Sequence, residues 1–313
     1  MKTLTVISPA FNEAQVIDDF YCELKQLLES LEKSYQCSMI FVVDRSSDRT
    51  FEILEQLALR DPTLQILSLS SRFGHQMSLL AGIDHADSDV IIMMDSDLQH
   101  PPSLIPSLLT KYEEGYDIVY TIRTDDQETG FLKRWTSQMF YRLMNRVSPV
   151  HIEESAADFR LISRRVAEIF QRQIRERNQF LRGLFAWVGF NSIGVEFQSR
   201  QRQAGSSKYS WGKLVQFAAT GVVAFSKRPL QAAVFMGVGF ASLGFALAII
   251  TFVGYFTYRS WPPGWATLAI LIPIFSGVQL IFLGIIGEYI AAIFDEVKAR
   301  PHYIVDKKVN FHE

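Results

Sequence analysis

The first two-thirds of the chain alternates short apolar runs with amphipathic segments. Five runs rich in β-branched and aliphatic residues end at polar or turn-forming residues, namely TLTVISP, MIFVVD, LQILSL, DVIIMMD and YDIVYT. The segments between them, such as 13–31 and 48–59, space their apolar residues as one face of a helix does. Strands that alternate with helices indicate crossover connections, so the pattern predicts an α/β domain with a mostly parallel sheet flanked by helices. We assign residues 1–210 to this domain.

Two much longer apolar stretches follow this domain. Residues 229–258 and 260–287 carry no charged side chain, and each stretch exceeds the ~20 residues that a bilayer-spanning helix needs. We therefore expect transmembrane helices over 229–258 and 265–287, joined by a tight turn within SWPPGW. The alternative is a pair of buried helices in a large soluble core, but such helices seldom run so long without charge.

Basic residues flank the two stretches on their outer ends. Between the stretches there is only Arg259, whereas four basic residues precede the first stretch and four follow the second: Lys208, Lys213, Lys227, Arg228, Lys298, Arg300, Lys307 and Lys308. Because loops rich in lysine and arginine stay in the cytoplasm, we expect both ends of the chain there, including residues 288–313. The pattern predicts a multi-pass protein of the cell membrane.

The remaining composition excludes several classes of protein. The N-terminus has no signal-peptide core, and Cys22 and Cys37 suit packing positions in a reducing compartment, since their spacing matches neither a redox pair nor a zinc site. A net charge of −2 argues against nucleic acid as a partner. The chain has no P-loop and no G-x-G-x-x-G, so a kinase, an NTPase or a Rossmann dehydrogenase would lack its phosphate-binding loop.

Polar residues gather where three of the predicted strands end. SPAFNE follows the first strand, DRSSD the second and DSDLQ the fourth, and an open α/β sheet brings such loops into one cleft. Asp95, Asp97 and Gln99 alternate along the last of these loops, so in an extended segment they project toward one face and can share Mg²⁺ or Mn²⁺. Aspartates are also common in loops for turns and caps, so this motif alone leaves both interpretations open.

Six ordered segments resemble one known family. ISPAFNEAQVI, VVDRSSDRT, GHQMSLLAGIDHA, DSDLQHPP, ADFRLISR and RQAGSSKYS occur in the order seen in family 2 glycosyltransferases of the GT-A fold. With the C-terminal apolar pair, the chain is most similar to the GtrB-like polyisoprenyl-phosphate glycosyltransferases, and the resemblance covers nearly its whole length. It implies a GT-A domain, an amphipathic interfacial helix over 211–228 and a two-helix transmembrane hairpin.

The resemblance also implies roles for residues around the nucleotide sugar. The residues expected to contact the base, ribose and sugar are Pro9, Ala10, Asn12, Glu13, Asp44, Asp95 and Ser96. Asp97 and Gln99 would hold the metal, and this role would make Asp97 essential for catalysis. Asp95 would lie near the ribose or reach the metal through water. The basic residues expected at the phosphates are Arg123, Arg202 and Lys208, and the alternative for each is a surface cation. We favour the phosphate role for Arg123 and Arg202 and leave both roles open for Lys208.

One loop departs from the family pattern. Where the family usually reads Asp-Asp-Gly-Ser, this chain has Val43-Asp44-Arg45-Ser46, which puts the base contacts of the loop in doubt. Arg45 could contact a phosphate or base, or be a solvated residue at a helix start. For Asp48 we favour a helix cap, because SSD precedes an apolar helical pattern.

The acceptor is expected at the membrane surface. Residues 131–147 and 211–229 mix basic with aromatic and aliphatic side chains, as an interfacial helix does. Family resemblance assigns Lys133 and Ser137 to the acceptor phosphate, and their spacing places them on one helical face. An ordinary amphipathic helix docked on the domain would have the same pattern.

Asp158 occupies the position often regarded as the catalytic base in the family. A phosphate monoester has a second pKa near ~6, so an acceptor phosphate is already largely ionised at neutral pH and has little need of a base. Asp158 could instead orient sugar hydroxyls or hold a basic neighbour.

The resulting hypothesis is an inverting transfer of a hexose to undecaprenyl or polyprenyl phosphate, with UDP-glucose as the favoured donor. GDP-mannose is the second choice, followed by UDP-amino-arabinose derivatives. A degenerate, membrane-tethered binding protein is the alternative of another class, whereas a flippase is disfavoured because the spans carry no charge. Small residues in GVGFASLGFA suit a homo-oligomer.

Overall fold

The structure is a computed structural model and describes residues 1–124, 156–177, 179–198, 228–257 and 264–311. The chain divides into two compact units. The first unit comprises residues 1–145, 150–210 and 300–313, and the second comprises residues 146–149 and 211–299. The second unit is therefore inserted in the sequence of the first.

A mixed sheet forms the centre of the first unit, with strands in the order β7-β5-β6-β4-β1-β2-β3-β8. The strands are β1 (Lys2–Ala10), β2 (Tyr35–Val43), β3 (Leu64–Leu69), β4 (Val90–Met93), β5 (Ile118–Arg123), β6 (Ala156–Ser163), β7 (Ser192–Phe197) and β8 (Val305–Val309). The run β3-β2-β1-β4 is parallel, as is β5 with β7, whereas β6 and β8 are antiparallel to their neighbours. All five predicted strands are confirmed, and the sheet is mixed because β6, between β4 and β5, and β8, beside β3, run antiparallel to their neighbours.

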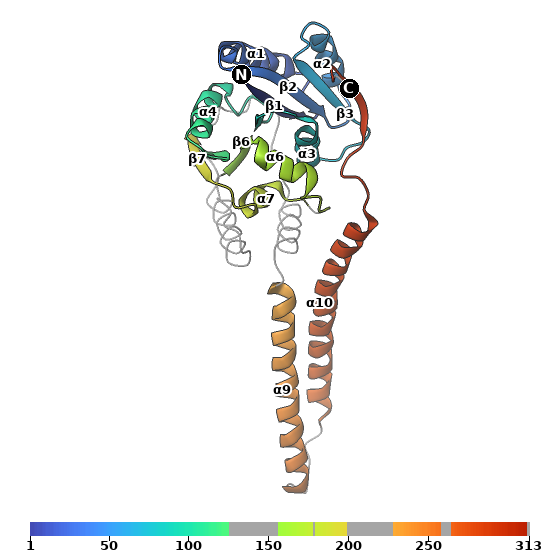
Figure 1. Ribbon diagram of the computed structural model, residues 1–313. Coiled ribbons are helices and arrows are strands. Elements are labelled where there is room, and N and C mark those ends of the chain that lie inside the picture. The colour runs from blue at the N-terminus through green and yellow to red at the C-terminus, as the bar shows by residue number, and fades with distance from the viewer. Residues whose placement is uncertain (125–155, 178, 199–227, 258–263, 312–313) are drawn as a thin grey trace. The chain divides into compact units, whose positions relative to one another are not determined.

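Helices cover both faces of this sheet (Figure 1). They are α1 (Ile17–Leu31), α2 (Thr50–Ala58), α3 (His75–His85), the short 3₁₀ helix η1 (Pro102–Leu104), α4 (Ile105–Glu113), α6 (Arg164–Arg172) and α7 (Leu181–Trp187). Apolar residues of α1, α2 and α4 share one core with alternate residues of β1, including Leu4 and Val6. On the other face, α3 packs so closely on β1 that a Cβ atom at Gly82 would overlap the Ile7 side chain. Parallel strands buried on both faces explain the continuous apolar runs of the sequence.

The C-terminal residues complete the sheet. Strand β8 pairs antiparallel with β3, with Ile66 opposite Val309 and Leu69 opposite Val305. The backbone N–H of Ser70 continues this contact by donating to the carbonyl oxygen of Ile304. The end of the chain, which the sequence assigned only to a cytoplasmic segment, is thus an edge strand of the first unit.

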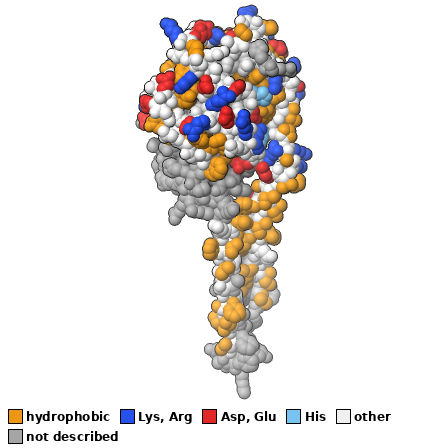
Figure 2. All heavy atoms as spheres, in the orientation of Figure 1, with side chains coloured by type: hydrophobic (Ala, Val, Ile, Leu, Met, Phe, Trp, Pro, Cys, Tyr) orange, Lys and Arg blue, Asp and Glu red, His pale blue; other side chains and the backbone are white. Residues whose placement is uncertain are grey.

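The second unit contains two long helices, α9 (Arg228–Thr257) and α10 (Trp265–Lys298). Their aromatic rings meet at Phe240 and Phe275, whose centroids are 5.8 Å apart. Within the described residues, the span Ile274–Lys298 is long and apolar enough to cross a bilayer, and Ala233–Ala246 is a shorter apolar stretch. Apolar side chains are exposed along the two helices (Figure 2). Phe245 and Leu280 are among the large ones. Helix α10 continues to Lys298, eleven residues beyond the expected end at 287.

Candidate active site

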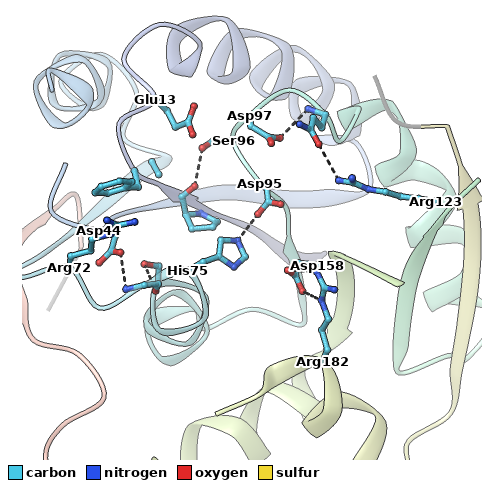
Figure 3. Close-up of a pocket in the computed structure, with 16 residues that line it drawn as sticks. Glu13, Asp44, Arg72, His75, Asp95, Ser96, Asp97, Arg123, Asp158 and Arg182 are labelled. Carbon is cyan, nitrogen blue, oxygen red and sulfur yellow. Dashed lines mark hydrogen bonds and ion pairs between the residues drawn. The ribbon is translucent and has the colours of Figure 1, made fainter. Parts of the chain in front are cut away.

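A cavity of about 420 Å³ opens at the carboxyl ends of β1, β2, β4 and β5 (Figure 3). The residues that line it are Pro9, Ala10, Phe11, Glu13, Asp44, Arg72, Gly74, His75, Ser78, Asp95, Ser96, Asp97, Gln99, Arg123, Asp158 and Arg182. The three loops therefore converge at one cavity, as predicted. It brings together ten of the predicted site residues: Pro9, Ala10, Glu13, Asp44, Asp95, Ser96, Asp97, Gln99, Arg123 and Asp158.

Asn12 is a predicted site residue that does not line the cavity. Its side-chain oxygen accepts a hydrogen bond from the backbone N–H of Ser47 at 2.8 Å, and its own N–H donates to Ser46 Oγ at 3.1 Å. The backbone of Asn12 has φ +57°, a left-handed conformation that asparagine tolerates better than most residues. Asn12 therefore links the loop after β1 to the loop after β2.

Asp48 also links these two loops. One carboxylate oxygen accepts from the backbone N–H of Thr50, the first residue of α2, at 3.1 Å, and the other accepts from Ala14 N–H at 3.0 Å. Burial opposes ionisation, but a hydrogen bond from the Thr50 hydroxyl, together with these two backbone hydrogen bonds, outweighs it and holds the pKa of Asp48 below its ordinary value. The N-cap residue of α2 is Arg49, without a side-chain capping bond, so Asp48 contacts the helix start from one residue before the expected cap position.

Asp44 is buried and organises the wall of the cavity. Its Oδ1 accepts from Phe73 N–H at 2.7 Å and its Oδ2 accepts from Gly74 N–H at 2.8 Å. The carboxylate thereby fixes the turn into α3, and each oxygen keeps a second lone pair for another donor. Arg45, the unusual residue beside it, has φ +44° and donates from Nη1 to Ser70 O at 2.6 Å. The Arg45 side chain is not among those lining the cavity.

Asp95 lies between two histidines. His75 Nε2 is 2.6 Å from Asp95 Oδ1, and His100 Nδ1 is 3.7 Å from Asp95 Oδ2. Burial lowers the pKa of His75, but the hydrogen bond and charge of Asp95 outweigh it and raise that pKa overall. Burial dominates for His100 and lowers its pKa, and Arg123 donates to His100 Nε2 at 3.1 Å. His100 thus lies between Arg123 and Asp95, whose backbone N–H donates to His100 Nδ1 at 3.4 Å.

The segment after β4 is not extended, which corrects one expectation. Strand β4 ends at Met93, and Leu98 has φ +60°, so the strict alternation of side chains is broken. Asp97 instead accepts the N–H of Gln99 at 3.1 Å within a turn, while Ser96 Oγ donates to Pro9 O at 2.9 Å. Turn geometry, rather than strand geometry, brings Asp95 and Asp97 to the same cavity.

The oxygen donors of this turn fit a hard divalent cation. Two carboxylates and the Gln99 amide line the cavity, and Mg²⁺ usually takes one or two carboxylates while keeping waters or substrate phosphates. Within the described residues, no cluster of three or more His, Cys, Asp or Glu side chains suits a metal ion. The donor set therefore fits a partly solvated magnesium or manganese ion and not an all-protein cage.

Asp158 forms a partly buried ion pair with Arg182. Arg182 donates from Nε to Asp158 Oδ1 at 2.7 Å and from Nη2 to Oδ2 at 2.8 Å, and Arg160 Nη2 is 4.0 Å from Oδ1. Burial opposes ionisation of Asp158, but the charge of Arg182 outweighs it and holds the pKa of the carboxyl well below its ordinary value. Burial likewise lowers the pKa of Arg160 to about 10. The sequence left two other roles open for Asp158, orienting sugar hydroxyls or holding a basic neighbour. In the structure Asp158 holds a basic neighbour, Arg182.

Four predicted site residues lie outside the described residues: Lys133, Ser137, Arg202 and Lys208. Conversely, the cavity contains lining residues without an assigned role in the sequence-based prediction: Phe11, Arg72, Gly74, His75, Ser78 and Arg182. Arg72 lies over the Phe11 ring at 4.0 Å. Gly74 and His75 could have been predicted as site residues, because they begin GHQMSLLAGIDHA, one of the six family-like segments. Arg182 lies in none of these segments.

Comparison with known proteins places the chain among glycosyltransferases. The family model described as Glycosyl transferase family 2 matches residues 5–170. The uncharacterized glycosyltransferase YkcC of Bacillus subtilis (strain 168) is 39% identical over 304 residues, which cover 97% of this chain and 93% of that protein. The SfII prophage-derived bactoprenol glucosyl transferase of Shigella flexneri is 38% identical, with 97% of each chain covered. Among solved structures, mannosyl-3-phosphoglycerate synthase from Rubrobacter xylanophilus is 15% identical, covers 74% of each chain and has a TM-score of 0.48.

Proposed function

Since the chain belongs to glycosyltransferase family 2 and is a glycosyltransferase, we propose that it transfers glucose from UDP-glucose to a polyprenyl phosphate at a membrane. The observation that carries this proposal is the cavity at the carboxyl ends of the strands, in a chain similar over 97% of its length to bactoprenol glucosyl transferases. The name of those relatives supports glucose and a polyprenyl acceptor.

The donor would lie along the loops after β1, β2 and β4. Phe11 and Arg72 offer adjacent planar groups at one end of the cavity, where Asp44 has lone pairs for a base N–H. Arg123 donates to Gln99 Oε1 at 3.4 Å and to His100 Nε2 at 3.1 Å, next to the turn with the oxygen donors. This arrangement supports a nucleoside at the Phe11 end and phosphates near Arg123.

The charge of the cavity supports a divalent cation as cofactor. Its lining contains five carboxylates (Glu13, Asp44, Asp95, Asp97 and Asp158) and three arginines (Arg72, Arg123 and Arg182). A nucleoside diphosphate would add further negative charge. Asp97 and Gln99 would hold Mg²⁺ or Mn²⁺, with Asp95 nearby, and the cation would supply stabilisation of the charge that develops on the departing diphosphate.

The reaction we propose is a single displacement. An acceptor phosphate oxygen attacks the anomeric carbon on the face opposite the nucleotide, the new carbon–oxygen bond forms, and the bond to the β-phosphate of UDP breaks. The products are a β-linked polyprenyl-phosphate glucose and UDP, so the configuration inverts for an α-linked donor. Side chains of the cavity bind and orient both substrates and exclude water, and none needs to act as a nucleophile.

The apolar helices would hold this cavity near its lipid substrate. We propose that residues 229–258 and 265–287 form a transmembrane hairpin, which agrees with the exposed apolar side chains of α9 and α10. Residues 211–228 would form an interfacial helix, and the first unit, with both chain ends, would lie in the cytoplasm. Arg202 and Lys208 would assist at the donor phosphates, and Lys133 and Ser137 at the acceptor phosphate.

A panel of labelled nucleotide sugars tests this function. The purified protein is incubated with undecaprenyl phosphate, Mg²⁺ or Mn²⁺, and either UDP-glucose or GDP-mannose. We expect a lipid-linked sugar from UDP-glucose, dependent on metal, with the β configuration by NMR. If only GDP-mannose gives a lipid-linked sugar, the donor is GDP-mannose and not UDP-glucose. An α-linked product would exclude inversion. If no donor gives a lipid-linked sugar, the proposed function is wrong.

A further inference from the structure

Arg182 and Asp158 form a preorganised pair on a part of the cavity away from the nucleotide loops. Asp158 is the third residue of β6, and Arg182 is the second residue of α7. In Figure 3 the pair lies on one side of Asp95, while Glu13 and Asp97 lie on the other. Because β6 is antiparallel to β4, with Met93 opposite Arg160, its beginning reaches the edge of the sheet where β4 ends. The pair therefore faces the cavity from elements that carry none of the donor loops.

The geometry of the pair disagrees with a base role for Asp158. Both carboxylate oxygens accept from one guanidinium, at 2.7 and 2.8 Å. A general base works best when its pKa lies near the working pH, whereas the charges of Arg182 and Arg160 hold this carboxyl strongly ionised. Arg182 from α7, Arg160 from β6 and His75 from α3 face it and favour the carboxylate, whereas Asp95 from the loop after β4 carries a like charge that opposes it. The positive groups outweigh Asp95, since the pKa of Asp158 stays well below its ordinary value. Asp158 is suited to hold a cation in place.

We propose that Arg182 binds the phosphate of the lipid acceptor and that Asp158 positions the guanidinium for it, an inference that rests on the proposed function. Two arginines surround one carboxylate here, so the cluster of Arg160, Arg182 and Asp158 keeps a net positive charge. Arg160 is buried, whereas the Arg182 side chain is 31% exposed and lines the cavity. A phosphate monoester carries nearly two negative charges at neutral pH, and a planar guanidinium is the side chain best shaped to meet it.

This assignment gives the transfer step its proton balance without a protein base. The acceptor phosphate enters already ionised, its oxygen forms the bond to the anomeric carbon, and the electron pair of the broken bond leaves with UDP. No proton has to be removed from the nucleophile. Arg182 would fix the phosphate in line with the departing group, and Asp158 would keep the guanidinium from turning toward the donor diphosphate.

The test separates acceptor binding from donor binding. The full-length protein is compared with Arg182→Gln, Arg182→Lys and Asp158→Asn, and with Arg60→Gln as an exposed arginine control outside the cavity. For Arg182→Gln we expect KM for undecaprenyl phosphate to rise about 10- to 100-fold, the loss expected for one charge-assisted contact. The Kd of UDP with Mn²⁺ should stay within about twofold. A weakened UDP affinity with unchanged lipid KM would assign Arg182 to the donor and overturn the inference.

The role of Asp158 is tested by combining the variants. If Asp158 acts through Arg182, Asp158→Asn raises the lipid KM less than Arg182→Gln does, and the double variant is no worse than Arg182→Gln alone. A base would instead show losses in kcat that add fully and become smaller as pH rises. Arg182→Lys, which keeps the charge, should recover part of the lipid affinity, whereas equal KM values for Lys and Gln would overturn phosphate binding.

UDP binding and wild-type activity distinguish loss of folding, failure of the inference and failure of the proposed function. A variant that unfolds loses UDP binding as well as activity, and in that case Arg182→Lys, the milder change, decides the question through its lipid KM. Failure of the inference is distinct from failure of the proposed function. A wild-type protein that makes lipid-linked glucose while Arg182→Gln keeps the wild-type lipid KM refutes only the inference, whereas a wild-type protein that makes no lipid-linked sugar refutes the function.

Discussion

Asp95 and Asp97 are two residues apart but have different partners. Asp95 pairs with His75 and lies near His100, while Asp97 accepts the N–H of Gln99 within the turn. A cation held mainly by Asp97 and Gln99 would lose a charged ligand in Asp97→Ala. Asp95→Asn would keep an oxygen that can accept from His75 and would lose only charge. The two aspartates should therefore contribute unequally.

We expect Asp97→Ala to lower kcat by ~10²–10³-fold, the range seen when a group that stabilises developing charge is removed. Asp95→Asn should lose less. The measurement is kcat at saturating UDP-glucose and undecaprenyl phosphate across a Mn²⁺ titration, with UDP affinity as the control for folding. Equal losses in the two variants would show that both carboxylates hold the cation in the same way.

Arg45 is the residue at which the chain departs most visibly from its family. The usual glycine suits the left-handed backbone, and here an arginine adopts φ +44° while donating to Ser70 O. Arg45→Gly and Arg45→Ala both lose this hydrogen bond. The positive φ at this position is unfavourable for alanine but not for glycine. We expect the alanine variant to be less stable than the glycine variant by about 1 kcal/mol in denaturant unfolding. Equal stabilities would mean that the loop changes its conformation when the arginine is absent.

At the residue level, the sequence identified side chains better than their contacts. The convergence of Glu13, Asp44 and Asp97 followed from strand ends alone, because parallel strands share one carboxyl edge. The partner of Asp158 could not be predicted, since Arg182 lies 24 residues away on a helix outside the family-like segments. Likewise, the position of Asn12 between two loops depends on Ser46 and Ser47, which no spacing rule connects to it.

Among the elements, buried strands were predictable and edge strands were not. Strands β1 to β4 are apolar runs because helices cover both of their faces. Strand β8 has the sequence VDKKV, with exposed polar residues, and resembles a charged tail until β3 is known to be its partner. Antiparallel β6 follows residues 125–155 and gives a mixed sheet that a strict βαβ pattern does not contain.

Asn310 secures the strand β8 to the rest of the sheet. Its Nδ2 lies 2.8 Å from Ala58 O, 3.2 Å from Asp61 O and 2.9 Å from Leu64 O, and its backbone has φ +60°. Asparagine meets both needs, because it tolerates the left-handed conformation and supplies the donors. The loop that joins α2 to β3 is thereby tied to the residues that follow α10.

Replacing Asn310 separates the hydrogen bonds from the backbone conformation. Asn310→Gly keeps the conformation but removes the donors, so we expect it to destabilise the protein by ~1–3 kcal/mol. Asn310→Ala should be worse by a further ~1 kcal/mol because alanine disfavours positive φ. Thermal unfolding of the detergent-solubilised full chain measures both changes. Unchanged midpoints in both variants would mean that β8 contributes little to the fold of the first unit.

On the scale of the whole molecule, hydropathy predicted the two long helices but not all of their limits. The uncharged stretches became α9 and α10, and α10 extends through Glu288 and Asp295 to Lys298, where charged residues no longer meet the expectation for a lipid-facing span. A helix needs only continuous backbone hydrogen bonds, whereas a span needs a long apolar stretch, so the length of α10 does not fix the end of the proposed span. The membrane arrangement therefore has to be tested on the protein in its membrane.

Cysteine labelling tests that arrangement, because the chain carries its own internal markers. Cys22 is exposed on the first unit, and Ser260 lies in the sequence between the two apolar stretches. If the stretches form a hairpin with both chain ends in the cytoplasm, a membrane-impermeant maleimide should label Ser260→Cys in intact cells, in a background with Cys22→Ser and Cys37→Ser. On the proposed orientation, in which the positive residues that flank the spans stay inside, the exposed Cys22 of the wild-type protein should be labelled only after permeabilisation. If Cys22 is labelled in intact cells, the first unit lies outside and the proposed orientation is wrong. If Ser260→Cys is protected in intact cells and is labelled only after permeabilisation, the hairpin does not cross the bilayer.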